Sequence, residues 1–158
     1  CFGMQMAIIE FARNKLNIKK ATSSEFGVGG IPIIGLINEW NKDGKVILGT
    51  DKNLGGTMRL GLYEAKLKEN SLVKKIYKSK TIQERHRHRY EVNISYKDQF
   101  EANGMIFSGL SPDNRLPEII ELKNHPWFVA VQFHPEFKSR PLAPHPLFSS
   151  FIKAAKNH

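Results

Sequence analysis

The stretch WFVAVQFHPE, residues 127–136, decides the fold of this chain. Its first seven residues form an apolar run, which is typical of a strand in the middle of a covered sheet. The polar side chains of His134 and Glu136 follow directly, at the edge where α/β sheets place their functional sites. The stretch therefore predicts a buried strand that delivers candidate functional residues at its end.

The spacing of apolar residues predicts a helix at each end of the chain. Residues 4–14 carry apolar side chains at positions i, i+3, i+4 and i+7, which is the pattern of an amphipathic helix. Pro146 suits the first turn of a last helix, because its missing N–H would have no partner there. The apolar face of this last helix consists of Leu147, Phe148, Phe151, Ile152 and Ala155.

The segments between these helices predict several strands and short connections. The predicted strands cover residues 31–37, 46–48, 85–94, 105–110 and 116–122. Residues 21–30 are expected to form a loop, and residues 54–61 a loop or a bent strand edge, because both are rich in glycine. Ser71 and Ser95 are each expected to cap a short helix. Helices around buried strands predict an α/β domain.

Composition narrows the class of protein. The chain has 158 residues, of which 41% are hydrophobic and 25% charged, so it fits one domain with a real core. No apolar run approaches the roughly 20 residues of a membrane span, so a soluble protein is expected. The net charge of +9 permits anionic partners. A single cysteine excludes an internal disulfide and favours a reducing, cytoplasmic location.

Cys1 stands where the first predicted helix begins. The positive end of the helix dipole favours the thiolate form of a cysteine at this position. Gly3 leaves room for a substrate carbonyl to approach the sulfur. Position alone is equally compatible with a small buried cysteine that simply begins a core helix.

His134 and Glu136 form a second candidate constellation. Residues i and i+2 of an extended chain point the same way, and Pro135 restricts the backbone between them. Glu136 can therefore orient His134 and stabilise its imidazolium, as the acid of a catalytic triad does. A lone His-Pro-Glu could also be a polar loop leaving a strand. Together with Cys1, however, the pair supplies a nucleophile, a base and an orienting acid.

The pattern Cys-x-Gly-x-Gln at residues 1–5, followed far downstream by His-Pro-Glu, resembles the class I (triad) glutamine amidotransferases. The glutaminase domain of the CTP synthase family resembles the chain most closely, from Cys1 to about residue 155. The segments that carry this closer resemblance are residues 22–26, 55–61, 84–92 and 124–128. The resemblance implies an α/β fold of the class I glutamine amidotransferase type, with a sheet flanked by helices.

The same resemblance implies the reaction and its residues. L-glutamine would be hydrolysed to glutamate and ammonia through a cysteinyl thioester. Cys1 would be the nucleophile, His134 the acid and base, and Glu136 the residue that holds His134. Thr57 and Arg59 would lie in the segment that responds to the activator GTP. The implied glutamine-binding residues are Phe2, Gln5, Glu25 and Arg89.

In that family the ammonia serves the ATP-dependent amination of UTP to CTP by an amidoligase domain. The implied cofactors of the full enzyme are ATP, Mg²⁺ and allosteric GTP, and the implied assembly is a homotetramer. No Gly-x-x-x-x-Gly-Lys-Ser/Thr loop occurs here, so no cofactor is expected in this chain. The amidoligase domain and the family's first strands are not in the sequence. Residues 1–158 are therefore expected to be the C-terminal part of a glutaminase domain, lacking its N-terminal strands and inactive alone.

Two other functions stay open. An N-terminal-nucleophile hydrolase would use the α-amino group of Cys1 as its base, although such enzymes place the nucleophile on a strand. A basic RNA-binding module would suit the charge but leaves His134 and Glu136 unexplained, so no nucleic-acid partner is expected. A strand over residues 85–89 puts three arginines on one face and two histidines on the other. No second ligand pair has zinc spacing, so no metal site is expected.

Overall fold

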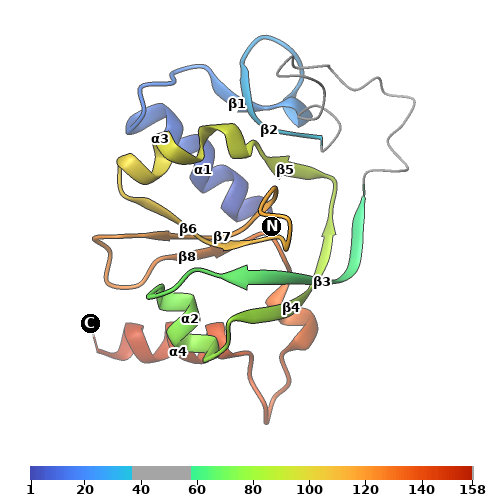
Figure 1. The fold of residues 1–158 in the computed structure, drawn as a ribbon, viewed down its shortest axis with the longest axis vertical. Coiled ribbons are helices and arrows are strands. Elements are labelled where there is room, and N and C mark those ends of the chain that lie inside the picture. The colour runs from blue at the N-terminus through green and yellow to red at the C-terminus, as the bar shows by residue number, and fades with distance from the viewer. Residues whose placement is uncertain (37–57, 158) are drawn as a thin grey trace.

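The computed structural model describes residues 1–36 and 58–157, and these form two sheets with helices packed around them (Figure 1). The larger sheet has the strand order β4-β3-β6-β7-β8, and the smaller has the order β1-β2-β5. The expected α/β class is confirmed. Thr57 and the predicted strand at residues 46–48 lie outside the described residues. Within the described part of the chain, no helix has the length and apolar character needed to cross a membrane.

The first helix, α1, spans Phe2–Asn14 and confirms the helix predicted at this end. Cys1 is its N-cap residue, without a side-chain hydrogen bond to the helix. The buried face of α1 packs against β1, β2 and β8. This face consists of Met4, Gln5, Ile8, Ile9, Phe11 and Ala12.

The five strands of the larger sheet pair only with antiparallel neighbours. They are β3 (Arg59–Leu67), β4 (Thr81–His88), β6 (Met105–Leu110), β7 (Pro117–Leu122) and β8 (Val129–Val131). The predictions for β6 and β7 are confirmed to within one residue. Strand β7 turns Ile120 toward α1 and Ile119 toward the helices on the other side, so both faces of the sheet are covered.

Strand β8 is shorter than the strand expected over residues 127–133. It has only three residues, lies at the end of the described strand order and is half-buried, so it is not a middle strand among the described residues. The indole nitrogen of Trp127 donates to Ser150 of the last helix at 2.8 Å, which draws the start of the run away from the sheet. An apolar run indicates burial, but a covering helix can supply that burial as well as a second strand can.

The smaller sheet joins β1 (Ala21–Ser23), β2 (Ile31–Leu36) and β5 (Tyr90–Val92). β1 runs parallel to β2 within a segment expected to be loop, because three residues are too few to show a strand pattern. The strand predicted at 85–94 is divided at Arg89 into β4 and β5, which belong to different sheets. Figure 1 shows the chain passing from the larger to the smaller sheet at this corner.

The remaining helices are α2 (Leu72–Tyr77), α3 (Lys97–Ala102) and α4 (Pro146–Lys156). The side chain of Ser71 caps α2 as predicted. The cap expected at Ser95 is wrong, because the Asn93 side chain accepts from the Ser95 N–H and caps a short 3₁₀ turn leading into α3. On α4 only Leu147 is buried, whereas the rest of the predicted apolar face is exposed or half-exposed.

Candidate active site

Cys1 lies where the start of α1 meets the end of β8. Its Sγ is 3.6 Å from the Nε2 amide of Gln132, and its backbone nitrogen donates to the Val131 carbonyl at 2.6 Å. These contacts hold Cys1, the candidate nucleophile, against the segment that leads into His134, the candidate base. The thiol is half-buried at the N-terminus of a 13-residue helix, where the helix dipole favours a thiolate.

His134 and Glu136 follow β8, and the structure brings them into contact as predicted. The Nδ1 of His134 lies 2.6 Å from Oε1 of Glu136. The backbone N–H of His134 donates to the Arg85 carbonyl at 2.9 Å, which ties the residue to β4. With Nδ1 engaged by the carboxyl group, Nε2 is the ring atom left to exchange protons with a substrate.

The Glu136 carboxylate also acts electrostatically at this site. Partial burial opposes its ionisation, but the hydrogen bond with His134 and nearby positive charge hold the pKa of Glu136 below its usual value. Burial lowers the pKa of the Cys1 α-amino group to about 6, and Glu136 opposes that shift. Cys1, His134 and Glu136 therefore share one electrostatic environment.

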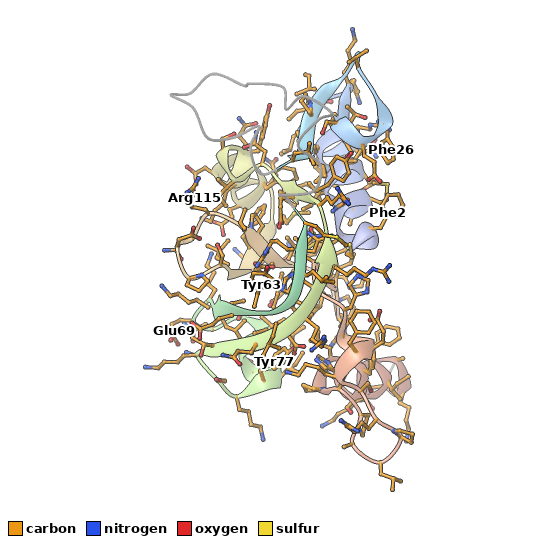
Figure 2. All side chains as sticks on the ribbon, turned by 90° about the vertical axis from the view of Figure 1, so that its right-hand side faces the viewer. Phe2, Phe26, Tyr63, Glu69, Tyr77 and Arg115 are labelled. Carbon is orange, nitrogen blue, oxygen red and sulfur yellow. The ribbon has the colours of Figure 1, made fainter. Side chains whose placement is uncertain are left out.

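Two of the predicted glutamine-binding residues, Phe2 and Glu25, lie on neighbouring segments. Glu25 is exposed on the 3₁₀ turn Ser24–Phe26. The ring of Phe26 meets the ring of Phe2 edge-on, with 6.2 Å between centroids (Figure 2). This contact holds the turn beside the first residue of α1, close in sequence to Cys1.

The other two, Gln5 and Arg89, meet at the corner between the sheets. Gln5 is buried, and its Nε2 donates to the Tyr90 carbonyl at 2.9 Å. Arg89 immediately precedes Tyr90, between β4 and β5. Phe2 and Gln5 therefore lie in the first turns of α1, and they contact Phe26 and Tyr90, the sequence neighbours of Glu25 and Arg89.

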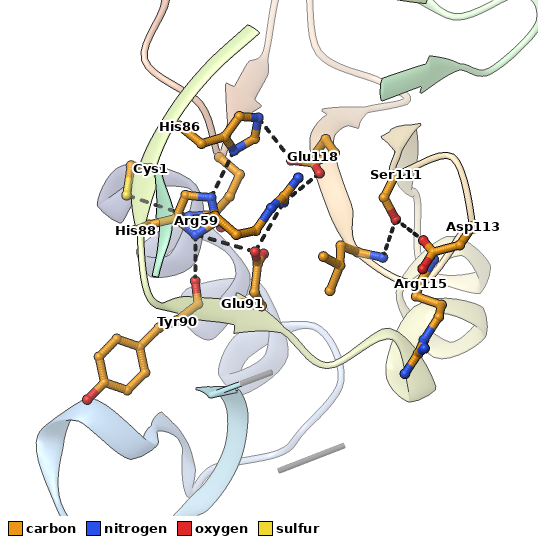
Figure 3. A network of polar contacts seen from close by, with 12 residues as sticks. Cys1, Arg59, His86, His88, Tyr90, Glu91, Ser111, Asp113, Arg115 and Glu118 are labelled. Atoms are coloured by element: carbon orange, nitrogen blue, oxygen red, sulfur yellow. Dashed lines mark hydrogen bonds and ion pairs between the residues drawn. The ribbon is translucent and has the colours of Figure 1, made fainter. Parts of the chain in front are cut away.

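Arg59 lies inside the protein. It belongs to β3, is 7% exposed, and its Nη1 contacts Oε1 of Glu91 at 3.1 Å and Oε1 of Glu118 at 2.7 Å (Figure 3). Burial opposes its charge, but these two carboxyl groups raise the pKa of Arg59 above its ordinary value. The contacts that Arg59 makes here are therefore internal ion pairs.

Sequence reasoning missed Gln132 and the buried partners of Arg59. Gln132 is fully buried, and the available signal was a single polar residue in an apolar run, two positions before His134. His86 and His88 were placed correctly on one strand face, but their burial and mutual hydrogen bond of 2.9 Å were not foreseen. In residues 1–36 and 58–157 no three His, Cys, Asp or Glu side chains are arranged to hold a metal ion.

Comparison with known proteins identifies clear relatives. Residues 1–154 match the family model of glutamine amidotransferase class-I. The CTP synthase of Pelagibacter ubique is 82% identical over 158 residues, which cover 100% of this chain and 29% of that protein. The CTP synthase of Hyphomonas neptunium is 60% identical over 156 residues, covering 98% of this chain and 29% of that protein. The chain therefore spans 29% of the length of these curated relatives.

A solved structure shows the same fold. It is the glutaminase domain of the Trypanosoma brucei CTPS with bound acivicin. It superimposes with a TM-score of 0.82 at 35% sequence identity, covering 98% of this chain and 58% of that chain.

Proposed function

The chain belongs to the class-I glutamine amidotransferase family, and we propose that it hydrolyses the side-chain amide of L-glutamine to glutamate and ammonia. One observation carries the proposal. Cys1, at the start of α1, is fastened to the end of β8, and β8 leads directly into the His134–Glu136 pair. These contacts support a nucleophile at Cys1 with His134 as its base and Glu136 as the orienting acid.

In the first half of the reaction, the Cys1 thiolate attacks the amide carbon of glutamine, and the carbonyl oxygen becomes an oxyanion. The tetrahedral intermediate collapses as the C–N bond breaks, and the His134 imidazolium gives its proton to the leaving ammonia. The product on the protein is a glutamyl thioester.

In the second half, neutral His134 takes a proton from water as the water oxygen attacks the thioester carbon. The C–S bond then breaks, which releases glutamate and restores the thiolate. Glu136 keeps the imidazole in one orientation and stabilises its charged form through the 2.6 Å contact with Nδ1.

Recognition of the amino-acid end of glutamine falls to charged side chains near α1. The Glu25 carboxylate suits the α-ammonium group, and the Arg89 guanidinium suits the α-carboxylate through two parallel hydrogen bonds. The backbone at Phe2 would help to hold the substrate. Gln5 already donates to the Tyr90 carbonyl, so its amide also holds the Arg89 corner against α1.

We further propose that the ammonia serves a CTP synthase reaction, the ATP-dependent amination of UTP. CTP synthase relatives at 82% and 60% identity support this assignment. The amidoligase domain, ATP, Mg²⁺ and a cytoplasmic homotetramer belong to the same proposal. GTP would act on the segment that contains Thr57 and Arg59. Because Arg59 is buried, it would act by anchoring that segment to Glu91 of β5 and Glu118 of β7.

The proposal is tested on the full-length gene product, with any flanking segments it carries. Glutamate release from glutamine, and labelling by a glutamine-like electrophile, should both disappear in Cys1→Ala. Amination with added ammonia should persist, because it needs no glutamine. Full hydrolysis by the variant, or labelling at another residue, would contradict the assignment.

A second candidate is an N-terminal-nucleophile hydrolase, in which the α-amino group of Cys1 would act as the base. Against it, the chain enters a helix at Phe2, and the amino group is engaged by the Val131 carbonyl. Acetylation of that amine should stop only this mechanism.

A further inference from the structure

Three polar side chains meet beside β4, close to the turn that carries Glu136. Tyr77 belongs to α2, Glu84 to β4, and His145 directly precedes α4, which packs beside α2 (Figure 1). Glu84 and His145 are only 2% and 3% exposed. Oε1 of Glu84 lies 2.9 Å from the Tyr77 hydroxyl and 2.9 Å from Nε2 of His145. The proposed chemistry uses none of these three side chains.

The contacts of this cluster place its hydrogens. Nδ1 of His145 accepts from the backbone N–H of Leu147 at 3.3 Å, and a backbone N–H can only donate. The single hydrogen of the His145 imidazole is therefore on Nε2, which donates to Glu84. Burial and the Glu84 charge raise the pKa of Tyr77, so its hydroxyl keeps its proton and donates to the same oxygen. Oε1 of Glu84 thus accepts two hydrogen bonds inside the protein.

Strand β4 holds both ends of the 3₁₀ turn Pro135–Lys138. At its start, the backbone N–H of His134 donates to the Arg85 carbonyl at 2.9 Å. At its end, the ammonium group of Lys138 donates to the Gln83 carbonyl. The turn is therefore fixed to two residues of β4 that are two positions apart.

Glu84 stands between these two strand residues and holds the chain that leaves the turn. Ser139 ends the turn, and its side-chain oxygen accepts from the backbone N–H of His145 at 3.0 Å. The ring of His145 donates to Glu84 in the interior. The Lys138 ammonium lies 3.7 Å from Oε2 of Glu84, which is an ion-pair distance and too long for a hydrogen bond. The hydrogen-bonded connection from Glu84 to the turn therefore runs through His145 and Ser139.

We propose that Glu84 is a positioning residue, which acts through His145 to fix the turn that orients the His134 ring. Two contacts of that ring come from the turn. Nδ1 meets Glu136 at 2.6 Å, and the Phe137 ring stacks on the imidazole with 5.1 Å between centroids. The Glu136 side chain is 56% exposed, so packing does little to hold it and its position depends on the turn. This role rests on the proposed function, in which His134 transfers protons.

The structural part of the proposal can be tested without any assay of activity. Long-range ¹⁵N–¹H spectra of the full-length gene product, labelled in histidine, should show His145 with its hydrogen on Nε2 and none on Nδ1. In Glu84→Leu the His134 signals should also change, because the turn no longer holds Glu136 against Nδ1. A hydrogen on Nδ1 of His145, or unaltered His134 signals in folded Glu84→Leu, would overturn the proposal. Neither result depends on whether the protein hydrolyses glutamine.

Two substitutions at Glu84 test the effect on the reaction, with rates expressed per folded protein from near-UV circular dichroism. Glu84→Gln keeps an oxygen that can accept from both Tyr77 and His145, so kcat should stay within about threefold. Glu84→Leu removes that acceptor and should lower kcat roughly tenfold. KM should stay within about twofold, because the candidate glutamine-binding residues lie elsewhere. A raised KM without a fall in kcat, or an unchanged kcat, would overturn the positioning role.

His145→Asn gives an independent test that keeps the carboxylate, and it decides the question if Glu84→Leu does not fold. Asparagine retains a side-chain oxygen that can cap α4 by accepting from the Leu147 N–H, but it is too short to reach Glu84. The loss of one hydrogen bond to the turn should lower kcat about fivefold while α4 stays capped. A folded His145→Asn protein with the kcat of the wild type would overturn the connection through His145.

Glu121→Gln is the matched control, because Glu121 is another buried carboxylate beside α2. It accepts from the backbone N–H groups of Leu72 and Val73 at the start of that helix. This variant should melt at a lower temperature but keep its kcat. If its kcat fell as far as that of Glu84→Leu, both losses would reflect stability and the positioning role would be overturned. Absence of hydrolysis in the wild type would overturn the proposed function instead.

Discussion

The side-chain amide of Gln132 lies 3.6 Å from the sulfur of Cys1, across 131 positions of sequence. Gln132 is fully buried, and its Oε1 has no hydrogen-bond partner among the described residues. An N–H donor aimed at a sulfur favours the thiolate over the thiol, as the helix dipole also does. The thiolate form of Cys1 is therefore stabilised by the amide of Gln132, directly after β8, as well as by the dipole of α1.

Gln132→Leu should slow alkylation of Cys1 by iodoacetamide at neutral pH by roughly tenfold, because the lost donor is one charge-assisted hydrogen bond. The measurement is the alkylation rate across pH, in which the thiolate fraction should rise only at higher pH than in the wild type. Gln99→Leu, an exposed change on α3, is the control and should leave the rate unchanged. An unaltered pH profile in folded Gln132→Leu would show that the amide does not act on the sulfur.

His134→Ala should abolish glutamine hydrolysis about as completely as Cys1→Ala, a loss of roughly 100-fold or more, because both proton transfers are lost. Glu136→Gln should be milder, since the orientation of His134 is weakened but the base remains. The rates are measured as glutamate formed in the full-length gene product. If Glu136→Gln lost as much activity as His134→Ala, Glu136 would have a role beyond orienting His134.

Elements set by local chemistry were predictable from the sequence. The apolar spacing of α1 and the serine that caps α2 act within one or two turns of chain, so they can be seen without the fold. Strand β1 and the cap of the turn before α3 were not predictable. Three residues show no periodicity, and Asn93 and Ser95 are both good caps separated by two positions.

The contacts of the candidate site likewise include one that local sequence predicts and others that depend on the fold. His134 and Glu136 are two residues apart and make the predicted contact, but not through the extended backbone expected for them, because Pro135–Lys138 form a 3₁₀ turn that His134 precedes. The contact of Gln132 with Cys1 and the approach of His86 to Glu118 depend on which strands and helices become neighbours. Alternation in β4 showed that the histidines share a face, but only the placement of β7 shows that a buried carboxyl group meets them.

Arg89→Lys should raise KM for glutamine roughly tenfold, because an ammonium group cannot form the two parallel hydrogen bonds of a guanidinium with a carboxylate. Synthesis driven by added ammonia should be unaffected. Arg87→Lys is the matched control, since Arg87 is exposed on β4 two residues earlier. If Arg87→Lys raised KM and Arg89→Lys did not, the substrate carboxylate would be recognised by Arg87 and not by Arg89.

Arg59→Met should destabilise the protein by about 3–5 kcal/mol, because it leaves the carboxyl groups of Glu91 and Glu118 buried without their cation. Thermal unfolding checks the loss, with the exposed Arg85→Met on β4 as the control. Basal and GTP-activated rates should fall together. A variant as stable as the wild type that lost only its response to GTP would contradict the anchoring role.

Stability should decline as the pH rises from 6.5 to 8. At the lower end of this range His86 and His88 act with the opposite sign, because burial lowers their pKa values from 6.5 to about 2 and 3 and only the unfolded chain binds protons on them there. The Glu91–Glu118 carboxyl pair makes the folded protein bind more protons than the unfolded chain, because burial raises the pKa of Glu91 from 4.5 to about 8. The folded protein therefore keeps a proton that the unfolded chain has released, and the resulting stabilisation is lost as pH rises through 8.

The expected decline is at most about 1.4 kcal/mol per pH unit, the value for one proton. The prediction concerns a difference between proteins, because the other titrating groups contribute alike to the wild type and the variants. Glu91→Gln removes the carboxyl group whose pKa is raised to about 8, and the decline should disappear. Glu121→Gln should retain it. Calorimetric melting at pH 6.5 and 8 gives the comparison, and equal pH dependence in wild type and Glu91→Gln would show that Glu91 holds no proton in the folded protein.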